Sequence, residues 1–475
     1  MRLQQKTWLS GSILGLLSAC ASAPSTGPSG SSARTPTVTL SPAGTSTEQG
    51  AVIPLVGAFQ VHRYSLPNGL RLLVVEDHSS PTVAYQTWFR VGSRDEVPGF
   101  TGLAHLFEHM MFKGTKTRAE GVFNRTLEQA GAEGLNAFTT RDFTAYVQEM
   151  PKDKLELLMQ LESDRMVNLV VNDEAFKTER EVVLSERRMR EENSPTGTIS
   201  NELNQLEFPH HPYGWPVIGF KEDLDRMQAT DAIEFYRTHY SPNHATVVVV
   251  GDVEAANIYR LVQKYYGLLP RQGADPRPLT PEPPQTDIRR KNLELPIQLE
   301  RLTLAYRIPE FLSPDTAVLD VVSTLLSGGP SSRLDRALVD TGIAGGVAVG
   351  NAEDEDPSIF EISVSLQKGK KAAQAESVVL MEIETLSHQV VGAQELERAK
   401  NRLDFNFYQS LDSNEEKANF IGQYETVAGD FRKAIEVRER IRTVTAEDVR
   451  TAIQKYLQPN SRTIVTAVPK TTAVK

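Results

Sequence analysis

Two histidines and one glutamate stand close together in the segment His105-Leu-Phe-Glu108-His109. On an α-helix the three side chains share one face, because four residues advance by about 400° and three residues by about 300° around the axis. Two neutral imidazoles on successive turns can bind one zinc ion, and a neighbouring carboxylate can deprotonate the water in the open coordination position. The pattern therefore indicates metal-assisted hydrolysis with Glu108 as the general base. Packed core histidines are the alternative, although burying three titratable groups without a metal ion is costly.

The residues around this pattern make it specific. H-x-x-E-H inside G-L-A-H-L-F-E-H-M-x-F-K-G-T resembles the inverzincin signature of the pitrilysin/insulinase metallopeptidases, which include the mitochondrial processing peptidase. In that family a glutamate in a segment like E-R-x-x-V-x-x-E completes the site. This chain has Glu179-Arg-Glu-Val-Val-Leu-Ser-Glu186, and Glu186 follows His109 by 77 residues (186 − 109). The resemblance implies one zinc ion on His105, His109 and Glu186, with Glu179 orienting the site. A solvated helix face with i,i+4 ion pairs is the alternative for this charged segment.

A second stretch resembles the strand on which the family binds its substrate. It contains Asn136, Ala137 and Phe138 and is followed by Asp142-Phe-Thr-Ala-Tyr146. In the family this edge strand holds a peptide main chain to main chain, so the resemblance implies a peptide substrate. An ordinary strand rich in threonine and aromatic residues is the alternative. The histidines of His210-His211-Pro-Tyr-Gly are expected in a structural turn, not in a second metal site.

The second half of the chain departs from the metal-site pattern. When Gly114 is aligned with Gly328, the residues Leu319, Val322 and Ser323 take the places of the two histidines and the glutamate, so this half cannot bind zinc in the same way. Many family members also carry an arginine and a tyrosine there, seven residues apart, that grip the substrate. Leu338 and Gly345 occupy those two positions.

The resemblance therefore implies a zinc-dependent endopeptidase that cleaves peptides or unfolded polypeptides. It also implies that the chain is the catalytic subunit of a heterodimer, in which a second chain of the family supplies the missing arginine and tyrosine. The alternative is a zinc-bearing scaffold or peptide-binding subunit with little turnover.

An internal repeat indicates the fold. Ala229, Asp231 and the following Pro-Asn and Thr recur as Ala446, Asp448 and a second Pro-Asn and Thr, at an offset of 217 residues (446 − 229). Each copy predicts a helix, a turn and a β-branched strand, at residues 246–250 and 463–468. Alternating or apolar strands are expected earlier in each half, at residues 82–91 and 298–308.

These patterns favour an α/β (α+β) fold of two homologous domains, each a mixed or antiparallel sheet with helices on one face. The zinc-bearing domain is expected at residues 53–270 and the second domain at residues 287–470, arranged as a clamshell. The Pro-rich residues 271–286 are expected to be the linker between them.

The N-terminal residues predict the subcellular localisation of the protein. Arg2 and Lys6 precede a short apolar stretch, which is typical of a signal peptide at residues 1–19. Leu17-Ser-Ala-Cys20 resembles the bacterial lipobox, which implies a lipid anchor on Cys20, and Ala21 resembles the outer-membrane sorting choice. Residues 20–52 contain few large apolar side chains and are expected to form a flexible tether. We therefore expect an outer-membrane lipoprotein facing the periplasm; an ordinary signal peptide is the alternative.

Composition excludes other classes of function. The 475 residues include 40% hydrophobic and 24% charged residues, as in globular proteins with sizeable cores. With 51 Lys+Arg against 61 Asp+Glu the net charge is −10, which argues against nucleic acid as a partner. The single cysteine excludes an intramolecular disulfide and a cysteine-rich zinc site.

Overall fold

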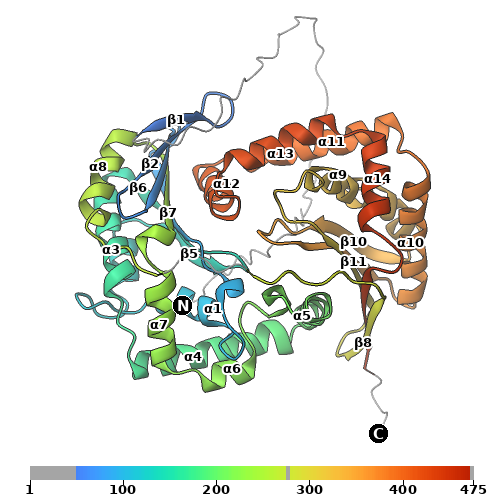
Figure 1. Cartoon of the computed structure of the whole chain (residues 1–475), viewed down its shortest axis with the longest axis horizontal. Helices are drawn as coiled ribbons and strands as arrows, with labels where there is room; N and C mark the ends of the chain where they lie inside the picture. The colour runs from blue at the N-terminus through green and yellow to red at the C-terminus, as the bar shows by residue number, and fades with distance from the viewer. Residues whose placement is uncertain (1–49, 274–278, 471–475) are drawn as a thin grey trace, which may run out of the picture.

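The computed structural model describes residues 50–273 and 279–470 (Figure 1). The expected signal peptide, Cys20, most of the tether, and part of the linker lie outside the described residues, so the lipid anchor and the outer-membrane address stay predictions. Among the described helices, none combines the length and the apolar character that crossing a membrane requires.

The first half of the chain is built on a seven-stranded mixed sheet with the order β1-β2-β3-β7-β4-β6-β5. All neighbours are antiparallel except the parallel pair β3 and β7. The strands are β1 (Ala51–Pro54), β2 (Gln60–Ser65), β3 (Arg71–Glu76), β4 (Thr82–Phe89), β5 (Glu133–Thr139), β6 (Thr144–Pro151) and β7 (Ala245–Gly251). The helices are α1 (Leu103–Met110), α2 (Val122–Gln129), α3 (Leu155–Asn168), α4 (Asp173–Arg187), α5 (Pro195–Glu207), α6 (Lys221–Arg226), α7 (Ala229–His239) and α8 (Ala255–Tyr266).

The second half is built on a five-stranded mixed sheet with the order β10-β11-β9-β12-β8, in which only β12 and β8 are parallel. The strands are β8 (Arg289–Leu295), β9 (Arg301–Ile308), β10 (Ala344–Asn351), β11 (Ser358–Leu366) and β12 (Arg462–Pro469). The helices are α9 (Thr316–Ser327), α10 (Ala372–His388), α11 (Ala393–Gln409), α12 (Asn414–Val427), α13 (Arg432–Thr443) and α14 (Ala446–Tyr456).

The expected fold class, two units that each pair a mixed sheet with helices, is confirmed. The repeat is present as α7 and β7 in one half and as α14 and β12 in the other. Two earlier strands are slightly shorter than the expected ranges 82–91 and 298–308. β4 ends at Phe89, and β9 begins at Arg301.

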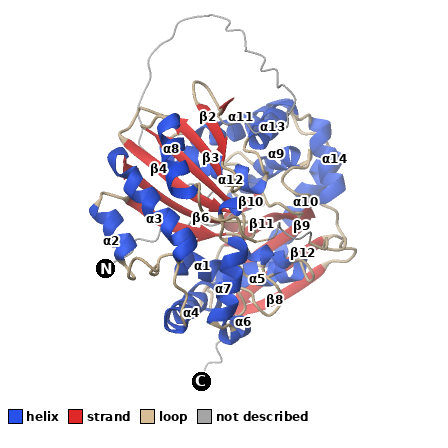
Figure 2. Cartoon of the chain, turned by 60° about the vertical axis from the view of Figure 1, so that its left-hand side comes forward, coloured by secondary structure: helices blue, strands red, loops and turns tan. Residues whose placement is uncertain are grey.

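The expectation of helices on one face of each sheet is wrong, because helices cover both faces. In Figure 2, α3 and α8 lie across one face of the first sheet. Its other face packs against α12 of the second half, where Trp88 and Val248 meet Phe420 and Ile421 in one buried cluster. The exchange is reciprocal: Leu203 of α5, from the first half, packs against the second sheet. At the repeat offset, α5 corresponds to residues 412–424, which is most of α12.

The apolar strands explain why both faces are covered. Every residue of β7, Ala-Thr-Val-Val-Val-Val-Gly, is buried, so side chains on both faces of the strand need packing partners. Gly422 of α12 lets the helix come close to the sheet, since a Cβ at this position would lie 2.1 Å from Trp88 Nε1. The two halves therefore share core contacts and are not joined by the linker alone.

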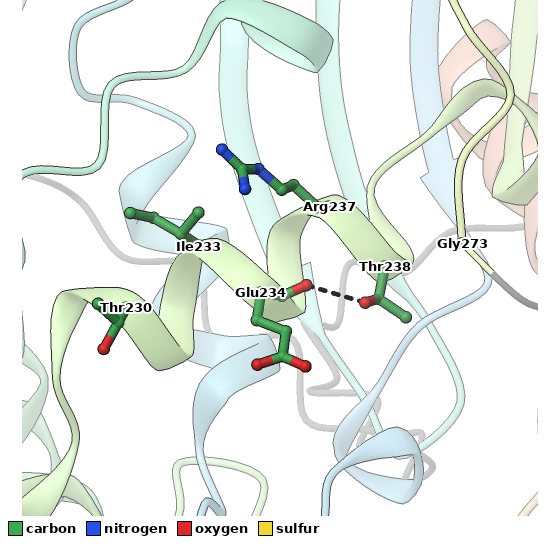
Figure 3. A pocket seen from close by; sticks show the side chains of 6 residues that line it. All are labelled: Thr230, Ile233, Glu234, Arg237, Thr238 and Gly273. Carbon is green, nitrogen blue, oxygen red and sulfur yellow. Dashed lines mark hydrogen bonds between the residues drawn. The ribbon is translucent and has the colours of Figure 1, made fainter.

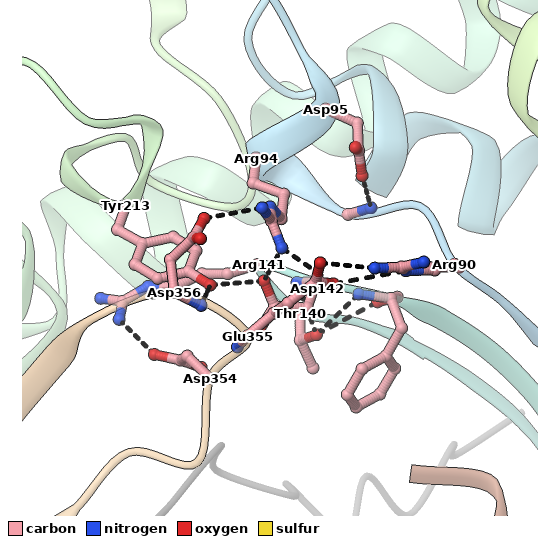
Figure 4. Close-up of polar contacts among 12 residues, drawn as sticks. Arg90, Arg94, Asp95, Thr140, Arg141, Asp142, Tyr213, Asp354, Glu355 and Asp356 are labelled. Atoms are coloured by element: carbon pink, nitrogen blue, oxygen red, sulfur yellow. Dashed lines mark hydrogen bonds and ion pairs between the residues drawn. The ribbon is translucent and has the colours of Figure 1, made fainter. Parts of the chain in front are cut away.

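A buried polar network also joins the halves at the end of β5 (Figure 4). Asp142 accepts hydrogen bonds from the Tyr213 hydroxyl at 2.6 Å and from the backbone N–H of Glu355 at 3.0 Å. Arg94 pairs with Glu355 at 2.8 Å and with Asp356 at 2.7 Å. Burial, more than any neighbour, raises the pKa of Asp142 to about 7. The acidic loop between β10 and β11 is thereby fixed against the first half.

Candidate metal centre

Helix α1 carries the H-x-x-E-H pattern. It begins after Gly102, which adopts φ 97°, and a Cβ there would lie 2.6 Å from the carbonyl oxygen of Ile218. The buried carboxylate of Glu96 accepts hydrogen bonds from the N–H groups of Gly102 and Ala104, at 2.8 and 2.9 Å, and so caps the helix. Leu106, Phe107 and Met110 of α1 are buried in the core of the first half. This packing fixes the helix that presents the candidate ligands.

The three side chains of the pattern lie together. His105, Glu108 and His109 each offer a ligand atom, and these atoms lie within 4.8 Å of one another. The two imidazole rings have centroids 4.9 Å apart. In the part of the chain that the structure describes, this is the one cluster of histidine, cysteine or acidic side chains suited to a metal ion.

Helix α4 brings both glutamates of the second segment to the same place. Glu186 Oε2 lies 3.2 Å from His109 Nε2 and 3.8 Å from His105 Nε2. At the other nitrogen of the same imidazole ring, Glu179 Oε1 lies 2.8 Å from His109 Nδ1. The seven-residue spacing of Glu179 and Glu186 thus puts one carboxylate on each nitrogen of the same imidazole.

These donors fit a zinc ion. A tetrahedral zinc about 2.0–2.2 Å from nitrogen and oxygen ligands separates its donor atoms by roughly 3.4 Å, and the two Glu186 distances fall on either side of this value. His105 is buried, and its Nδ1 has no hydrogen-bond partner among the described residues. Glu108 is held differently, since its Oε2 accepts a 2.7 Å hydrogen bond from Thr139 Oγ1. The geometry favours Glu186 as the third donor and Glu108 as a base beside the ion.

The surroundings of the site shift the pKa values of the three proposed ligands. Burial lowers the pKa of His105, which favours the neutral imidazole that binds metals. Burial also acts on His109, but the carboxylates of Glu179 and Glu186 outweigh it and raise the pKa of His109 to about 9. Burial opposes ionisation of Glu186, yet the two histidines and Arg190 lower its pKa to about 2. Glu186 is therefore ionised at neutral pH, whereas His109 holds a proton that a metal ion must displace.

Zinc uptake should release this proton. At pH 7 the zinc-free chain carries His109 as imidazolium, and since zinc binds only the neutral ring, we expect about one proton to leave this side chain per zinc. The apparent zinc affinity should accordingly rise as pH increases toward about 9. Calorimetric titrations in buffers of different ionisation enthalpy measure the released protons. Glu179→Gln removes the negative charge beside the His109 ring, so fewer protons should be released per zinc than in the wild type. Equal proton release by the wild type and Glu179→Gln would contradict the assignment.

The predicted substrate strand lies beside this site. β5 contains Asn136, Ala137 and Phe138 and is an edge strand of the first sheet, paired among the described strands with β6 only. Its last residue, Thr139, makes the hydrogen bond to Glu108. The free edge of β5 therefore ends at the candidate base, which is suitable for a peptide added as a further strand.

Three neighbouring residues have roles that the sequence did not indicate. Lys113 pairs with Glu179 at 2.6 Å, and Arg190 pairs with Glu186 Oε1 at 2.8 Å. Arg190 pairs with the glutamate four residues before it, and this i,i+4 spacing is a signal that could have found it. Lys113 of the α1 segment pairs with a glutamate of α4, so no local pattern could have found its role. Thr139 reaches Glu108 from another element, so no local pattern could have found it.

Other candidate positions lie elsewhere. His211 bonds Asp356 of the polar network at 3.2 Å, so this histidine belongs to the junction of the halves and not to the metal cluster. Leu338 is buried in the core of the second half, and Gly345 lies on the edge strand β10. Neither residue can hydrogen-bond a substrate through its side chain.

A shallow hollow on α7 does not compete with this site (Figure 3). It is lined by Thr230, Ile233, Glu234, Arg237, Thr238 and Gly273. Thr238 Oγ1 donates to the carbonyl oxygen of Glu234 at 2.9 Å, which is an ordinary intrahelical contact. None of these six residues belongs to the metal-suited cluster of the described chain.

Comparison with known proteins agrees with the site. The family model "Insulinase (Peptidase family M16)" matches residues 71–219, and "Peptidase M16 inactive domain" matches residues 226–403. The chain is 29% identical over 410 residues to the zinc protease PqqE of Helicobacter pylori, covering 85% of this chain and 92% of that protein. It is 25% identical over 407 residues to a probable mitochondrial-processing peptidase subunit beta of Arabidopsis thaliana, covering 83% and 75%.

Solved structures show the same fold. A protease from Helicobacter pylori superposes with a TM-score of 0.82 at 29% identity, covering 86% of this chain and 99% of that one. The first half of the periplasmic protease PqqL from Escherichia coli superposes with a TM-score of 0.73 at 20% identity, covering 86% and 92%. Both matches span the two sheets described above, since they cover more of the chain than either half contains.

Proposed function

Because the chain belongs to the insulinase family of peptidases, family M16, we propose that it is a zinc-dependent endopeptidase acting on peptides or unfolded polypeptides. The resemblance found in the sequence is thereby confirmed at the level of the family. The observation that carries the proposal is that Glu186 Oε2 of α4 lies close to the Nε2 atoms of both His105 and His109. Glu108 lies on α1, the helix of the two histidines, in the same cluster.

In this proposal one zinc ion is bound by His105, His109 and Glu186, and when bound it would polarise the scissile carbonyl and acidify a water molecule. Glu108 accepts the proton of the attacking water and passes it to the leaving amine. The Thr139 hydroxyl, which donates to Glu108 Oε2, leaves Oε1 for this transfer. Glu179 accepts a hydrogen bond from His109 Nδ1 and so turns Nε2 toward the ion.

The free edge of β5 supports a peptide substrate. A peptide that pairs with Asn136, Ala137 and Phe138 through its backbone runs along the strand toward Thr139 and Glu108. Recognition of this kind uses main-chain hydrogen bonds and depends little on any one side chain. It requires an extended segment, which favours unfolded polypeptides over folded proteins as substrates.

The missing substrate-gripping side chains support a partner subunit. Leu338 and Gly345 offer no donor to a peptide carbonyl or to a developing oxyanion. The Arabidopsis relative is by its name one subunit of a processing peptidase. We therefore include in the proposal a second chain of the family that supplies the arginine and tyrosine, in a heterodimer.

The rival function is a zinc-bearing scaffold or peptide-binding subunit with little turnover. The match of residues 226–403 to an inactive domain and the loss of the arginine and tyrosine favour it. However, that match lies outside the residues of the candidate site, which all fall within the insulinase match at residues 71–219. The candidate base Glu108, which a zinc-bearing scaffold would not need, therefore favours the peptidase.

The peptidase and its partner can be tested together. The purified chain alone should bind zinc and cleave an unfolded fluorogenic peptide slowly. Adding a family chain that carries the arginine and tyrosine should increase the rate about 100-fold or more, as expected when oxyanion donors are restored. Fast cleavage by a monodisperse sample of this chain alone would contradict the partner, and no cleavage in either sample would favour the scaffold.

A further inference from the structure

We propose that Arg190 is a positioning residue for the third metal ligand, an inference that rests on the proposed zinc site. The two oxygens of Glu186 have different partners. Oε1 lies 2.8 Å from Arg190 Nη2, whereas Oε2 lies 3.2 and 3.8 Å from the imidazole Nε2 atoms of His109 and His105. The guanidinium thus keeps one oxygen away from the ion and aims the other at it, which makes Glu186 a ligand through a single oxygen.

The backbone around Arg190 is built to hold this position. α4 ends at Arg187 and continues directly into a π-helical turn at Arg188–Glu192, closed by the bond from Asn193 N–H to Arg188 O at 2.8 Å. Such turns are rare and occur often at functional sites. The wider turn begins two residues after Glu186, so it sets where the side chain of Arg190 projects.

The next helix locks this turn in place. A Cβ on Gly197 of α5 would lie 2.0 Å from the carbonyl oxygen of Arg190, so the close approach requires a glycine. Thr198 Oγ1 donates to the carbonyl oxygen of Glu191 at 2.8 Å, and Asn201 also bonds the Glu191 side chain. Because α5 packs on the second sheet, the position of Arg190 depends on contacts from both halves.

The pair differs from an ordinary surface ion pair. An exposed i,i+4 pair contributes little to stability, and the Arg190 side chain is 52% exposed. The Glu186 side chain, however, is only 13% exposed and faces two imidazoles. Among the described side chains, Arg190 is the one arginine or lysine that pairs with Glu186. Its contribution should therefore appear in metal binding and not in the stability of the fold.

Zinc affinity of the full chain tests this inference. Removing a residue that orients a metal ligand typically weakens metal binding about 10–100-fold, and because Arg190 is half exposed we expect about 10-fold for Arg190→Ala. Arg190→Lys keeps the charge without the planar fork and should lose less. Arg188→Ala, an exposed arginine of the same turn, is the matched control and should bind zinc as the wild type does. Competition with a chromophoric chelator measures the zinc dissociation constants.

The outcomes separate this inference from the proposed function. The thermal stability of the zinc-free proteins should be the same in all variants, because the pair acts through the ligand. If the wild type takes up zinc and Arg190→Ala binds it equally well, or if Arg188→Ala weakens binding as much, the inference is overturned while the zinc site stands. If the wild type itself takes up no zinc, the proposed function fails and the inference fails with it.

Discussion

Glu108→Gln should abolish peptide hydrolysis while leaving zinc uptake and the fold unchanged. Glutamine keeps the size of the side chain and can still accept the hydrogen bond from Thr139, but it cannot take a proton from water. General-base catalysis contributes about 10²–10⁴-fold to rates, so cleavage of an unfolded fluorogenic peptide should fall by at least about 100-fold. Zinc content and melting temperature should match those of the wild type, because Glu108 is not one of the three proposed ligands.

The control for this substitution is Glu181→Gln. Glu181 is an exposed glutamate on α4, and its loss should leave hydrolysis unchanged. Both variants are measured beside the wild type, with the chain alone and with its partner chain. Hydrolysis that persists in Glu108→Gln would show that the observed cleavage does not come from this site, and the scaffold function would then be favoured.

Glu186→Ala should remove zinc from the chain. The substitution deletes the carboxylate whose Oε2 lies 3.8 Å from His105 Nε2 and 3.2 Å from His109 Nε2. Since loss of a partner that merely orients a ligand costs about 10–100-fold in affinity, loss of the ligand itself should cost more than about 100-fold. Hydrolysis should disappear with the metal, whereas the fold should persist, because the Glu186 side chain takes no part in the buried cores.

Glu181→Ala on the same helix is the matched control for metal content. It should retain zinc at the level of the wild type, as measured by elemental analysis after gel filtration. If Glu186→Ala retained equal zinc through dialysis against a chelator, two histidines and some other donor would hold the ion, and the donor set proposed here would be wrong. Glu108 would then be the first residue to test, since it lies in the same cluster.

The local part of the site could be predicted from the sequence. The positions of His105, Glu108 and His109 on one helix face follow from their spacing alone, and the structure brings these side chains together. Glu186 needed the family resemblance, because the residues between His109 and Glu186 contain no local signal of where the helix of Glu186 lies. The contact between Thr139 and Glu108 joins a strand to a helix and could be found only in the folded chain.

The exchange of α5 and α12 between the halves could not be predicted from helix and strand patterns. Nothing in the sequence of either helix says which sheet its buried side covers, and α12 buries Lys417 and Glu425 beside its apolar side chains. The signal lay in the strands, since the continuous valines of β7 require packing on both faces. Gly422 gave a weaker signal, because its role as the point of contact with Trp88 depends on a residue more than 300 positions away.

X-ray absorption at the zinc edge of the zinc-loaded full chain tests the central claim most directly. We expect one zinc per chain with two imidazole nitrogens and only oxygen donors otherwise, and we expect Glu186→Ala to lose this spectrum. A site with sulfur, with one imidazole or with three would contradict the assignment of His105, His109 and Glu186, as would a chain that binds no zinc at all.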